Sequence, residues 1–389
     1  MQLTTLTALM ARARPVAAAA LIAAALLSGA ASLAEERAGV RVDVYTDEWI
    51  QVVSPAIEGG FGVGAGVQVN GGYSVDVLSG ATRTQTVDVV SSATTFSERR
   101  HQASLSATAS RHADRSATVG YTLSAEPDYV SNVGSVGFSK EILERMATVG
   151  GTYRLGRDRF GTATGEAVEG SAINQSLELG WSHILSRRTK GSLTLAGDYS
   201  ACAESLGCQS SAYRFVPVLD LGAPQSLLSL RERHPETRLR GAGALRLSQA
   251  LSTELALHAS YRYYADSWEV RGHTASLAAA RTLLDERLMV RLDARGGWQR
   301  PASFYRDNYA IDGELSEQLP DYRSADPELA GVTSAMARGR VSWTWFSLGP
   351  LMEFGPNVRV ARLWYRYHEL EELPERDAWM IGGGASGSF

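Results

Sequence analysis

The chain ends in an alternating segment, Trp379-Met380-Ile381-Gly382-Gly383-Gly384-Ala385-Ser386-Gly387-Ser388-Phe389. Its apolar residues Trp379, Ile381, Ala385 and Phe389 share one parity, whereas Met380, Ser386 and Ser388 share the other. Successive side chains of a strand point to opposite faces. The segment therefore predicts a β-strand with one apolar face, which ends on an aromatic residue.

The same two-residue alternation recurs along the chain. In 116–124, for example, Val119 and Tyr121 alternate with hydroxyl side chains such as Thr118 and Thr122. Other segments with this period are 63–77, 102–110, 147–155, 173–181, 193–199, 239–247, 255–263, 288–298 and 341–345, with weaker ones near 130–142, 268–284 and 357–368. Together with 378–389 they predict an all-β protein of about 14 strands, within a range of about 12 to 16.

The amino-terminal segment has the pattern of an export signal. Arg12 and Arg14 precede an apolar run over 15–27, and small residues follow up to Ala34. This pattern predicts a signal peptide over 1–34 that is cleaved after Ala34. The run is shorter than the roughly 20 residues that a membrane-spanning helix needs.

No later segment of the chain is apolar enough to cross a membrane as a helix. A closed barrel is the remaining spanning structure. We therefore expect a transmembrane antiparallel β-barrel over 61–389, as a monomer in outer-membrane lipid of a Gram-negative bacterium. The terminal Phe389 resembles the signal that barrel-assembly machinery recognises in its clients.

Short and long connections alternate between the expected strands. Short ones fall near 112–115, 142–146, 185–190, 249–252, 284–287 and 347–351, and long ones fall at 79–97, 157–170, 200–236, 300–327 and 369–377. If the last strand ends in the periplasm, the long connections are external. Residues 35–60 stay undecided as an arm, a lumen plug or an extra strand, because the strand-like segment 40–57 makes the total odd. Pro55 argues against a regular central strand there.

Arginines dominate the inward parity of the expected wall. They are Arg154, Arg238, Arg240, Arg246, Arg262, Arg291, Arg295, Arg338, Arg340 and Arg362, with Glu178, Asp198, Glu254, Asp266 and Asp293 as expected counterions. Alternating charges in a narrow lumen favour a salt-bridged filling. The alternative is an arginine-lined route for phosphate or carboxylate ligands.

Two further residue groups have simple structural interpretations. Cys202 and Cys208 lie close together in the longest external connection, which predicts a disulfide in an oxidising compartment. A metal or redox pair is the alternative, but the spacing is not C-x-x-C and no His is adjacent. Large aromatic residues fall near strand ends and are expected to form membrane-interface girdles: Trp181, Tyr199, Tyr261, Tyr263, Trp298, Trp343, Trp345 and Trp379.

Several short stretches resemble one family of bacterial proteins. They are Tyr73–Thr82, Ser97–Arg100, Ser124–Tyr129, Tyr261–Trp268 with His273-Thr274, and Gln299 followed by Phe304-Tyr305. The chain resembles, from about 60 to 330, the domain of unknown function 3570. The resemblance implies a signal-bearing outer-membrane barrel without an established activity. It hints only by association at a periplasmic redox pathway.

The resemblance and the topology together place carboxylates at the external rim. The candidates for a ligand or metal site are Asp76, Glu98, Glu126, Asp128 and Asp266. Oxygen ligands from neighbouring strand ends favour a calcium-like divalent cation, although no cofactor is required. The competing interpretation is a structural network in which these acids pair with Arg99, Arg100 and Arg262.

Catalytic motifs are absent from the sequence. There is no G-x-S-x-G, H-E-x-x-H or Walker pattern, so we expect no enzyme. A surface hydrolase would have to use His101 or His273 with Ser79 or Asp266. The net charge of -4 disfavours nucleic-acid binding.

The favoured function is a channel, a transporter or a barrel that binds a small-molecule ligand at its external rim. The alternative is a structural or partner-binding barrel that serves a periplasmic redox-related pathway.

Overall fold

The computed structural model describes residues 36–63, 66–81, 95–112, 114–161, 170–202, 215–220, 227–311, 319–347, 353–370 and 374–388. The expected signal peptide 1–34, Cys208 and Phe389 lie outside these described residues. Among the described residues, no helix is long and apolar enough to cross a membrane.

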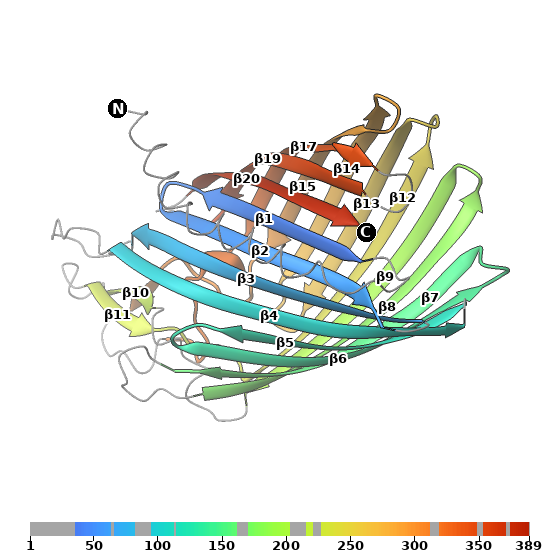
Figure 1. Cartoon of the computed structure of the whole chain (residues 1–389). Helices are drawn as coiled ribbons and strands as arrows, with labels where there is room; N and C mark the ends of the chain where they lie inside the picture. The colour runs from blue at the N-terminus through green and yellow to red at the C-terminus, as the bar shows by residue number, and fades with distance from the viewer. Residues whose placement is uncertain are drawn as a thin grey trace.

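In the part of the chain that the structure describes, sixteen antiparallel strands form a closed wall (Figure 1). They are β1 Arg37–Thr46, β2 Ile50–Gly62, β3 Val67–Ala81, β4 Thr95–His112, β5 Arg115–Ala125, β6 Tyr129–Ile142, β7 Ala147–Phe160, β8 Gly170–Ser186, β9 Thr189–Cys202, β12 Thr237–Ala250, β13 Leu255–Asp266, β14 Arg271–Leu283, β15 Leu288–Arg300, β17 Val332–Trp343, β19 Glu353–Tyr367 and β20 Glu375–Ser388. The two-residue strand β18, Phe346–Ser347, pairs only with β19. Pairing of β1 with β20 closes the barrel, so the wall has no free edge.

The amino-terminal segment that the sequence left undecided is a hairpin of the wall. Strands β1 and β2 pair with each other, β1 pairs with β20, and β2 pairs with β3. Asp47 creates the turn, because its Oδ1 accepts hydrogen bonds from the backbone N–H groups of Trp49 at 2.8 Å and Ile50 at 2.7 Å. Residues 37–62 are thus neither a plug nor a single extra strand, and the count becomes even.

Pro55 lies within β2 despite the expectation that it would disrupt a central strand. The β2–β3 ladder is interrupted there, since no pairs form between Val53 and Ala56. On its other side Pro55 remains opposite Val42 of β1. Because proline has no N–H, the β2–β3 ladder loses hydrogen bonding locally, and the strand continues past Pro55.

The outer face of the wall is apolar. Large side chains of outward parity are exposed, including Leu105 (60%), Leu239 (60%), Leu277 (67%) and Leu292 (62%). Outward aromatic residues lie toward both barrel ends, with Trp181, Trp343 and Trp345 toward one and Tyr199, Tyr261, Tyr263, Trp298 and Trp379 toward the other. An apolar band between two aromatic girdles is the signature of a transmembrane barrel.

The two barrel ends differ in their connections. The turns 143–146, 251–254 and 284–287 lie at the end that holds Arg37 and Ser388. The opposite end carries the long connections 203–236 and 301–331. These two connections meet in a small sheet of β10 Phe215–Asp220, β11 Leu227–Arg231 and β16 Tyr309–Ile311, in which β10 and β16 run parallel. We call the described residues of 215–236 and 301–331 the mouth cap.

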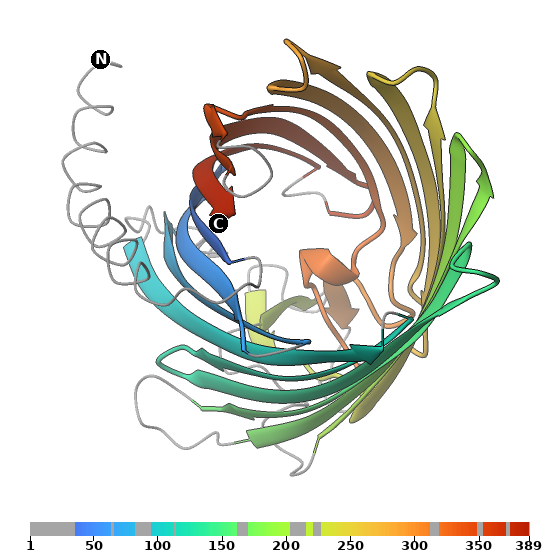
Figure 2. The same cartoon turned by 45° about the vertical axis from the view of Figure 1, so that its right-hand side comes forward.

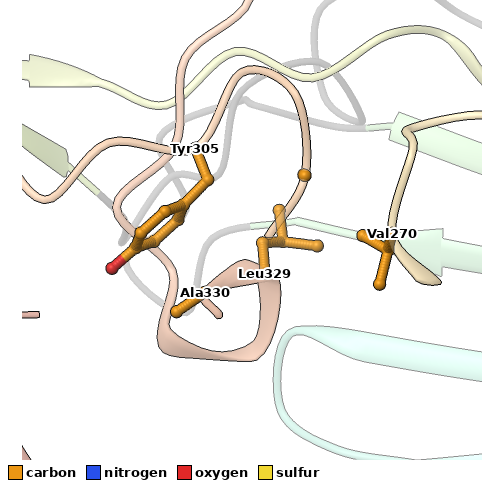
Figure 3. Packing of buried hydrophobic residues seen from close by; sticks show 5 residues of the cluster. Val270, Tyr305, Leu329 and Ala330 are labelled. Atoms are coloured by element: carbon orange, nitrogen blue, oxygen red, sulfur yellow. The ribbon is translucent and has the colours of Figure 1, made fainter. Parts of the chain in front are cut away.

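The mouth cap has its own buried core. Tyr305, Leu329 and Ala330 pack with Val270 and Ala302, as Figure 3 shows for the labelled side chains. A short 3₁₀ helix, η1 Pro327–Leu329, belongs to this core. Figure 2 shows the orange segment that includes β16 and η1 projecting within the ring of wall strands.

Inward wall residues hold the mouth cap in place. Tyr264 of β13 and Tyr367 of β19 pack against its core. Gln299 of β15 donates to the backbone carbonyls of Glu328 at 2.9 Å and Ala330 at 3.0 Å. The cap is therefore fixed to the lumen side of this end of the wall.

We expect the Asp47 turn to stabilise the closed barrel in a pH-dependent way. The Asp47 carboxylate is fully buried and accepts a hydrogen bond from Arg376 Nε of β20 at 2.7 Å. Burial alone would raise the pKa of Asp47, but the N–H groups of Trp49 and Ile50 and the Arg376 guanidinium outweigh it, so the pKa is lowered. A lowered folded-state pKa contributes stability above the unfolded pKa of about 3.9, and this stability is lost as pH falls below it.

The corresponding test is urea unfolding of the wild type and Asp47→Asn between pH 7 and pH 3. At pH 7 the variant should lose about 1.5–3 kcal/mol, the contribution typical of hydrogen bonds to a charged group. The gap between the two proteins should narrow toward pH 3. A gap that does not change with pH would contradict the role of the ionised Asp47.

Candidate functional site: the lumen wall

The lumen lining differs between the two halves of the barrel. From β4 to β7 most of the inward residues are small, and they include Ser104, Ser106, Thr118, Gly120, Thr122, Ser135, Gly137 and Thr152. From β12 round to β1 the inward positions carry most of the arginines. Long cationic side chains therefore face small hydroxyl residues across the lumen.

All eight arginines of the predicted lumen set lie on the inward face, opposite in parity to exposed Leu245, Tyr261, Leu292 and Val341. Three have carboxylate partners. Arg238 Nε donates to Asp266 at 2.9 Å, while Arg291 and Arg338 bind Asp293 at 3.0 and 3.2 Å. Within the described ranges, the guanidinium of Arg240 forms a side-chain hydrogen bond only with Ser200 Oγ, at 3.4 Å. Among the described residues, no ion pair forms with the remaining four, Arg246, Arg262, Arg295 and Arg340.

The lumen is thus not a uniformly salt-bridged filling. Arg246, Arg262 and Arg295 are solvent-exposed although they point into the barrel. Exposed inward charges indicate water in the lumen, because an unpaired charge in a dry interior is strongly unfavourable. Paired arginines fix parts of the wall, and unpaired arginines leave positive charge facing this water.

Arg154 is also inward, but the prediction for Arg362 was wrong. Arg362 shares its parity with the outward residues Val358 and Trp364. Its guanidinium binds Asp377 at 2.7 Å and lies over the rings of Trp364 and Trp379. Arg359 and Arg362 are three positions apart, so one strand cannot turn both inward; the inward one is Arg359.

Three inward arginines form a row across adjacent strands. Arg340 of β17 is the direct cross-strand partner of Arg291 on β15 and of Arg359 on β19. Like charges at such positions destabilise a sheet unless they are compensated. Arg291 has Asp293, and Arg359 Nε donates to Asp43 of β1 at 2.9 Å. The central Arg340 has no carboxylate partner among the described residues.

Two connected hollows lie along this side of the lumen. The larger, of about 670 Å³, opens toward the end with the short turns and is lined by residues that include Asn70, Ser104 and Ser342. The smaller, of about 180 Å³, contains all of Arg41, Asp43, Glu58, Arg340, Asn357 and Arg359 in its wall. Both are lined by Gly39, Glu58, Asn357 and Ser386, so they are continuous. We call the smaller one the seam hollow, because it lies where β1 and β20 close the barrel.

Sequence reasoning missed several of these lining residues. Arg41, Asp43 and Glu58 belong to the β1–β2 hairpin, whose place in the wall the sequence does not determine, and Arg359 is absent from the predicted lumen set. Their signal was present in the alternation of Arg41 and Asp43 with Val40, Val42 and Val44. The alternation predicts inward side chains only once 37–62 is assigned to the wall.

The five predicted rim carboxylates do not form one cluster. Asp76 and Glu126 lie 3.8 Å from Arg100, and burial together with Glu98 and Asp128 raises the pKa of Glu126 despite Arg100. These four acids belong to β3, β4 and the β5–β6 turn.

Asp266, by contrast, lies on β13, on another part of the wall. Its buried carboxylate binds Arg238, accepts from Tyr264 at 2.8 Å, and accepts from the backbone N–H groups of Trp268 and Val270 at 3.0 Å. Among the described residues, no group of three or more His, Cys, Asp and Glu side chains is arranged to hold a metal ion.

The histidines considered for a hydrolase point away from the lumen. His101 Nδ1 lies 2.7 Å from Tyr73 Oη, and His273 Nδ1 lies 2.6 Å from Tyr261 Oη, both on the outer face. Asp266 faces inward, so the structure does not join it to His273. Neither histidine is brought to Ser79 in the described contacts. Cys202 is disulfide-bonded, and its predicted partner Cys208 lies outside the described residues.

The fold and its outward apolar face define the class of the protein, a transmembrane antiparallel β-barrel. The family resemblance is confirmed, since residues 170–344 match the model described as "Protein of unknown function (DUF3570)". The match covers β8 to β17 and the mouth cap, whereas the similar stretches between 73 and 129 lie outside it. No curated protein matches the chain.

Solved outer-membrane proteins are similar in fold. The protein OpdK from Pseudomonas aeruginosa is 9% identical with a TM-score of 0.44, and the alignment covers 92% of this chain and 99% of OpdK. A structure described as a bacterial polysaccharide outer membrane secretin is 10% identical with a TM-score of 0.49, covering 92% and 98%. OccK2 from P. aeruginosa, in complex with glucuronate, is 10% identical with a TM-score of 0.44, covering 92% and 98%. These likenesses concern the fold alone and carry no argument about function.

Proposed function

We propose that this protein is an outer-membrane channel that conducts small hydrophilic solutes and prefers anions. The outward apolar band and its two aromatic girdles support a position in the membrane. The single observation that carries the channel function is the set of unpaired inward arginines in a hydrated lumen. Positive charge at a constriction raises the local concentration of anions and repels cations.

The mouth cap fits this function as a fixed narrowing at one end. Its core packs on Tyr264 and Tyr367. Buried Glu232 ties its two connections together, because its Oε1 accepts from Ser324 Oγ at 2.8 Å and from the Ala325 N–H at 3.1 Å. The opposite end offers the larger hollow as an entrance. Solutes would therefore meet the cap at one end and the arginine row beyond it.

Single-channel recording in planar bilayers tests the channel. The wild type should give ohmic steps, and in a KCl gradient its reversal potential should show a chloride preference. Removing three unpaired arginines together, by Arg246→Ala, Arg262→Ala and Arg295→Ala, should lower the chloride-to-potassium permeability ratio by roughly fivefold, as expected for about 1 kcal/mol of charge interaction in water.

A matched triple variant controls for net charge. Arg157→Ala, Arg271→Ala and Arg281→Ala remove the same charge from outward positions and should leave the permeability ratio unchanged. Silence from folded, heat-modifiable wild type, or an equal shift in both triple variants, would contradict the proposed function.

A further inference from the structure

The seam hollow is lined by three arginines and two carboxylates, and one of the carboxylates, Asp43, is ion-paired. Arg359 binds Asp43 through Nε at 2.9 Å and also through its terminal nitrogen. Arg41, half-exposed, lies 3.9 Å from the same carboxylate. These three residues form an ion-paired group that keeps one net positive charge on the closing strands of the barrel.

Two charged residues of the hollow are left without such a partner. Arg340 enters from β17 and Glu58 enters from β2, and among the described residues neither forms an ion pair or a side-chain hydrogen bond. Strands β19, β20 and β1 lie between them. At about 4.8 Å per strand, the strands that carry these two residues are about 19 Å apart along the wall, so the side chains approach the hollow from opposite sides.

The floor between these two charges is small. Gly39, Ala56, Gly383, Ala385 and Ser386 line it. Asn357 lies on β19, the strand next to that of Arg340, and no described residue forms a hydrogen bond with its side-chain amide. The amide therefore offers both a donor and an acceptor. Among the described residues that line the hollow, Arg340, Glu58 and the Asn357 amide are thus available to a ligand around an open space.

We propose that the seam hollow binds a small zwitterion, a solute that carries one carboxylate and one ammonium group. Arg340 and Asn357 donate to the carboxylate, for which the guanidinium fork is well suited. Glu58 accepts from the ammonium. The volume of about 180 Å³ suits a solute of amino-acid size, below the range of about 300–1,000 Å³ for drug-sized ligands. This inference rests on the proposed function, in that the hollow lies on the solute path.

Calorimetric titration of the detergent-solubilised full chain tests the inference with two matched sets of probes. One set is 4-aminobutanoate, butanoate and butylammonium; the other is glycine, acetate and methylammonium. We expect at least one zwitterion to bind at least tenfold more tightly than both of its singly charged counterparts, since it engages both free charges at once.

Variants assign the contacts. Arg340→Ala and Glu58→Gln should each weaken zwitterion binding by about tenfold or more, and Arg340→Lys should restore part of the loss because it keeps the charge. Arg154→Ala and Glu178→Gln remove inward charges outside the hollow and should leave binding unchanged. Heat-modifiable migration confirms that each variant is folded.

The two proposals fail in different ways. Binding of the simple anions as tightly as the zwitterions, with no effect of Glu58→Gln, would overturn the inference in favour of an anion site and leave the channel intact. Absence of saturable zwitterion binding in a protein that conducts would also overturn the inference and leave the channel intact. Zwitterion binding by a protein that conducts nothing would support the site and overturn the channel.

Discussion

Deletion of residues 37–62 is expected to abolish the folded barrel. The hairpin of β1 and β2 supplies the ladders that join β20 to β3, and these ladders run along most of each strand. Its removal leaves β3 and β20 with unpaired backbone groups in lipid, where each costs several kcal/mol. We expect loss of heat-modifiable migration and of protease resistance after refolding into lipid vesicles.

A plug would behave differently under the same deletion. Removing a plug leaves the wall folded and increases conductance, so a folded deletion variant with larger current steps would contradict the wall assignment. A folded barrel of unchanged strand pairing elsewhere, closed by direct pairing of β3 with β20, would contradict the expected loss of folding. Addition of a peptide of residues 36–63 serves as the control, because it should restore protease resistance if the hairpin only supplies the missing edge.

The substitution Gly382→Ala should cause the second largest loss of stability, because it disrupts the ion pair between Asp43 and Arg359. A Cβ atom at Gly382 would lie 2.1 Å from Asp43 Oδ1 and 2.7 Å from Arg359 Nε. Gly382 is the cross-strand neighbour of both residues, so only a residue without a side chain lets the pair close over β20. Overpacking of this kind costs about 1–3 kcal/mol, and separation of the partly buried pair adds to it.

Urea unfolding in lipid measures this effect, with Gly383→Ala as the matched control. Gly383 is the next residue but has the outward parity, and a Cβ there meets only Asn357 O at 3.8 Å. We expect Gly382→Ala to lose about 2 kcal/mol or more and Gly383→Ala to change stability by less than about 0.5 kcal/mol. Equal effects of the two substitutions would show that loss of glycine flexibility, and not the ion pair, determines stability here.

The arginine row links this stability to the proposed transport. Asp43 compensates Arg359 at one side of Arg340, and Asp293 compensates Arg291 at the other. The flanking ion pairs therefore reduce the repulsion on Arg340 without neutralising it. A change at Gly382 should alter the position of Arg359 and, through it, the charge that a solute meets in the seam hollow.

Much of the wall was predictable from sequence because its signal is local. In 116–124, the side chains of Val119 and Tyr121 are indeed exposed on the outer face. Within each segment, the alternation separates the inward residues from the outward ones. The inward positions of Arg240 and Arg295 could therefore be predicted from their own segments. The alternation of short and long connections likewise agrees with the observed strand ends.

Prediction from the sequence failed where one local pattern fits two alternative structures. The segment 40–57 alternates from Val40 to Val44, and nothing in that alternation shows that Asp47 caps a turn just beyond it. Arg359 and Arg362 lie on one expected strand with opposite parity, and the charge of each fits either face. The rim carboxylates were grouped by their height along the wall, which gives no information on how many strands separate Asp266 from Asp76.

The sequence by itself determined an all-β transmembrane barrel, the direction of most side chains and the asymmetry of the two ends, because a period of two residues is a property of each strand alone. The tertiary structure decided the closure of β1 on β20, the row Arg291–Arg340–Arg359 and the sheet that joins β10 to β16 in the mouth cap. These features depend on pairing between residues distant in the chain, and such pairing is selected by the combined energy of all ladders around the closed wall.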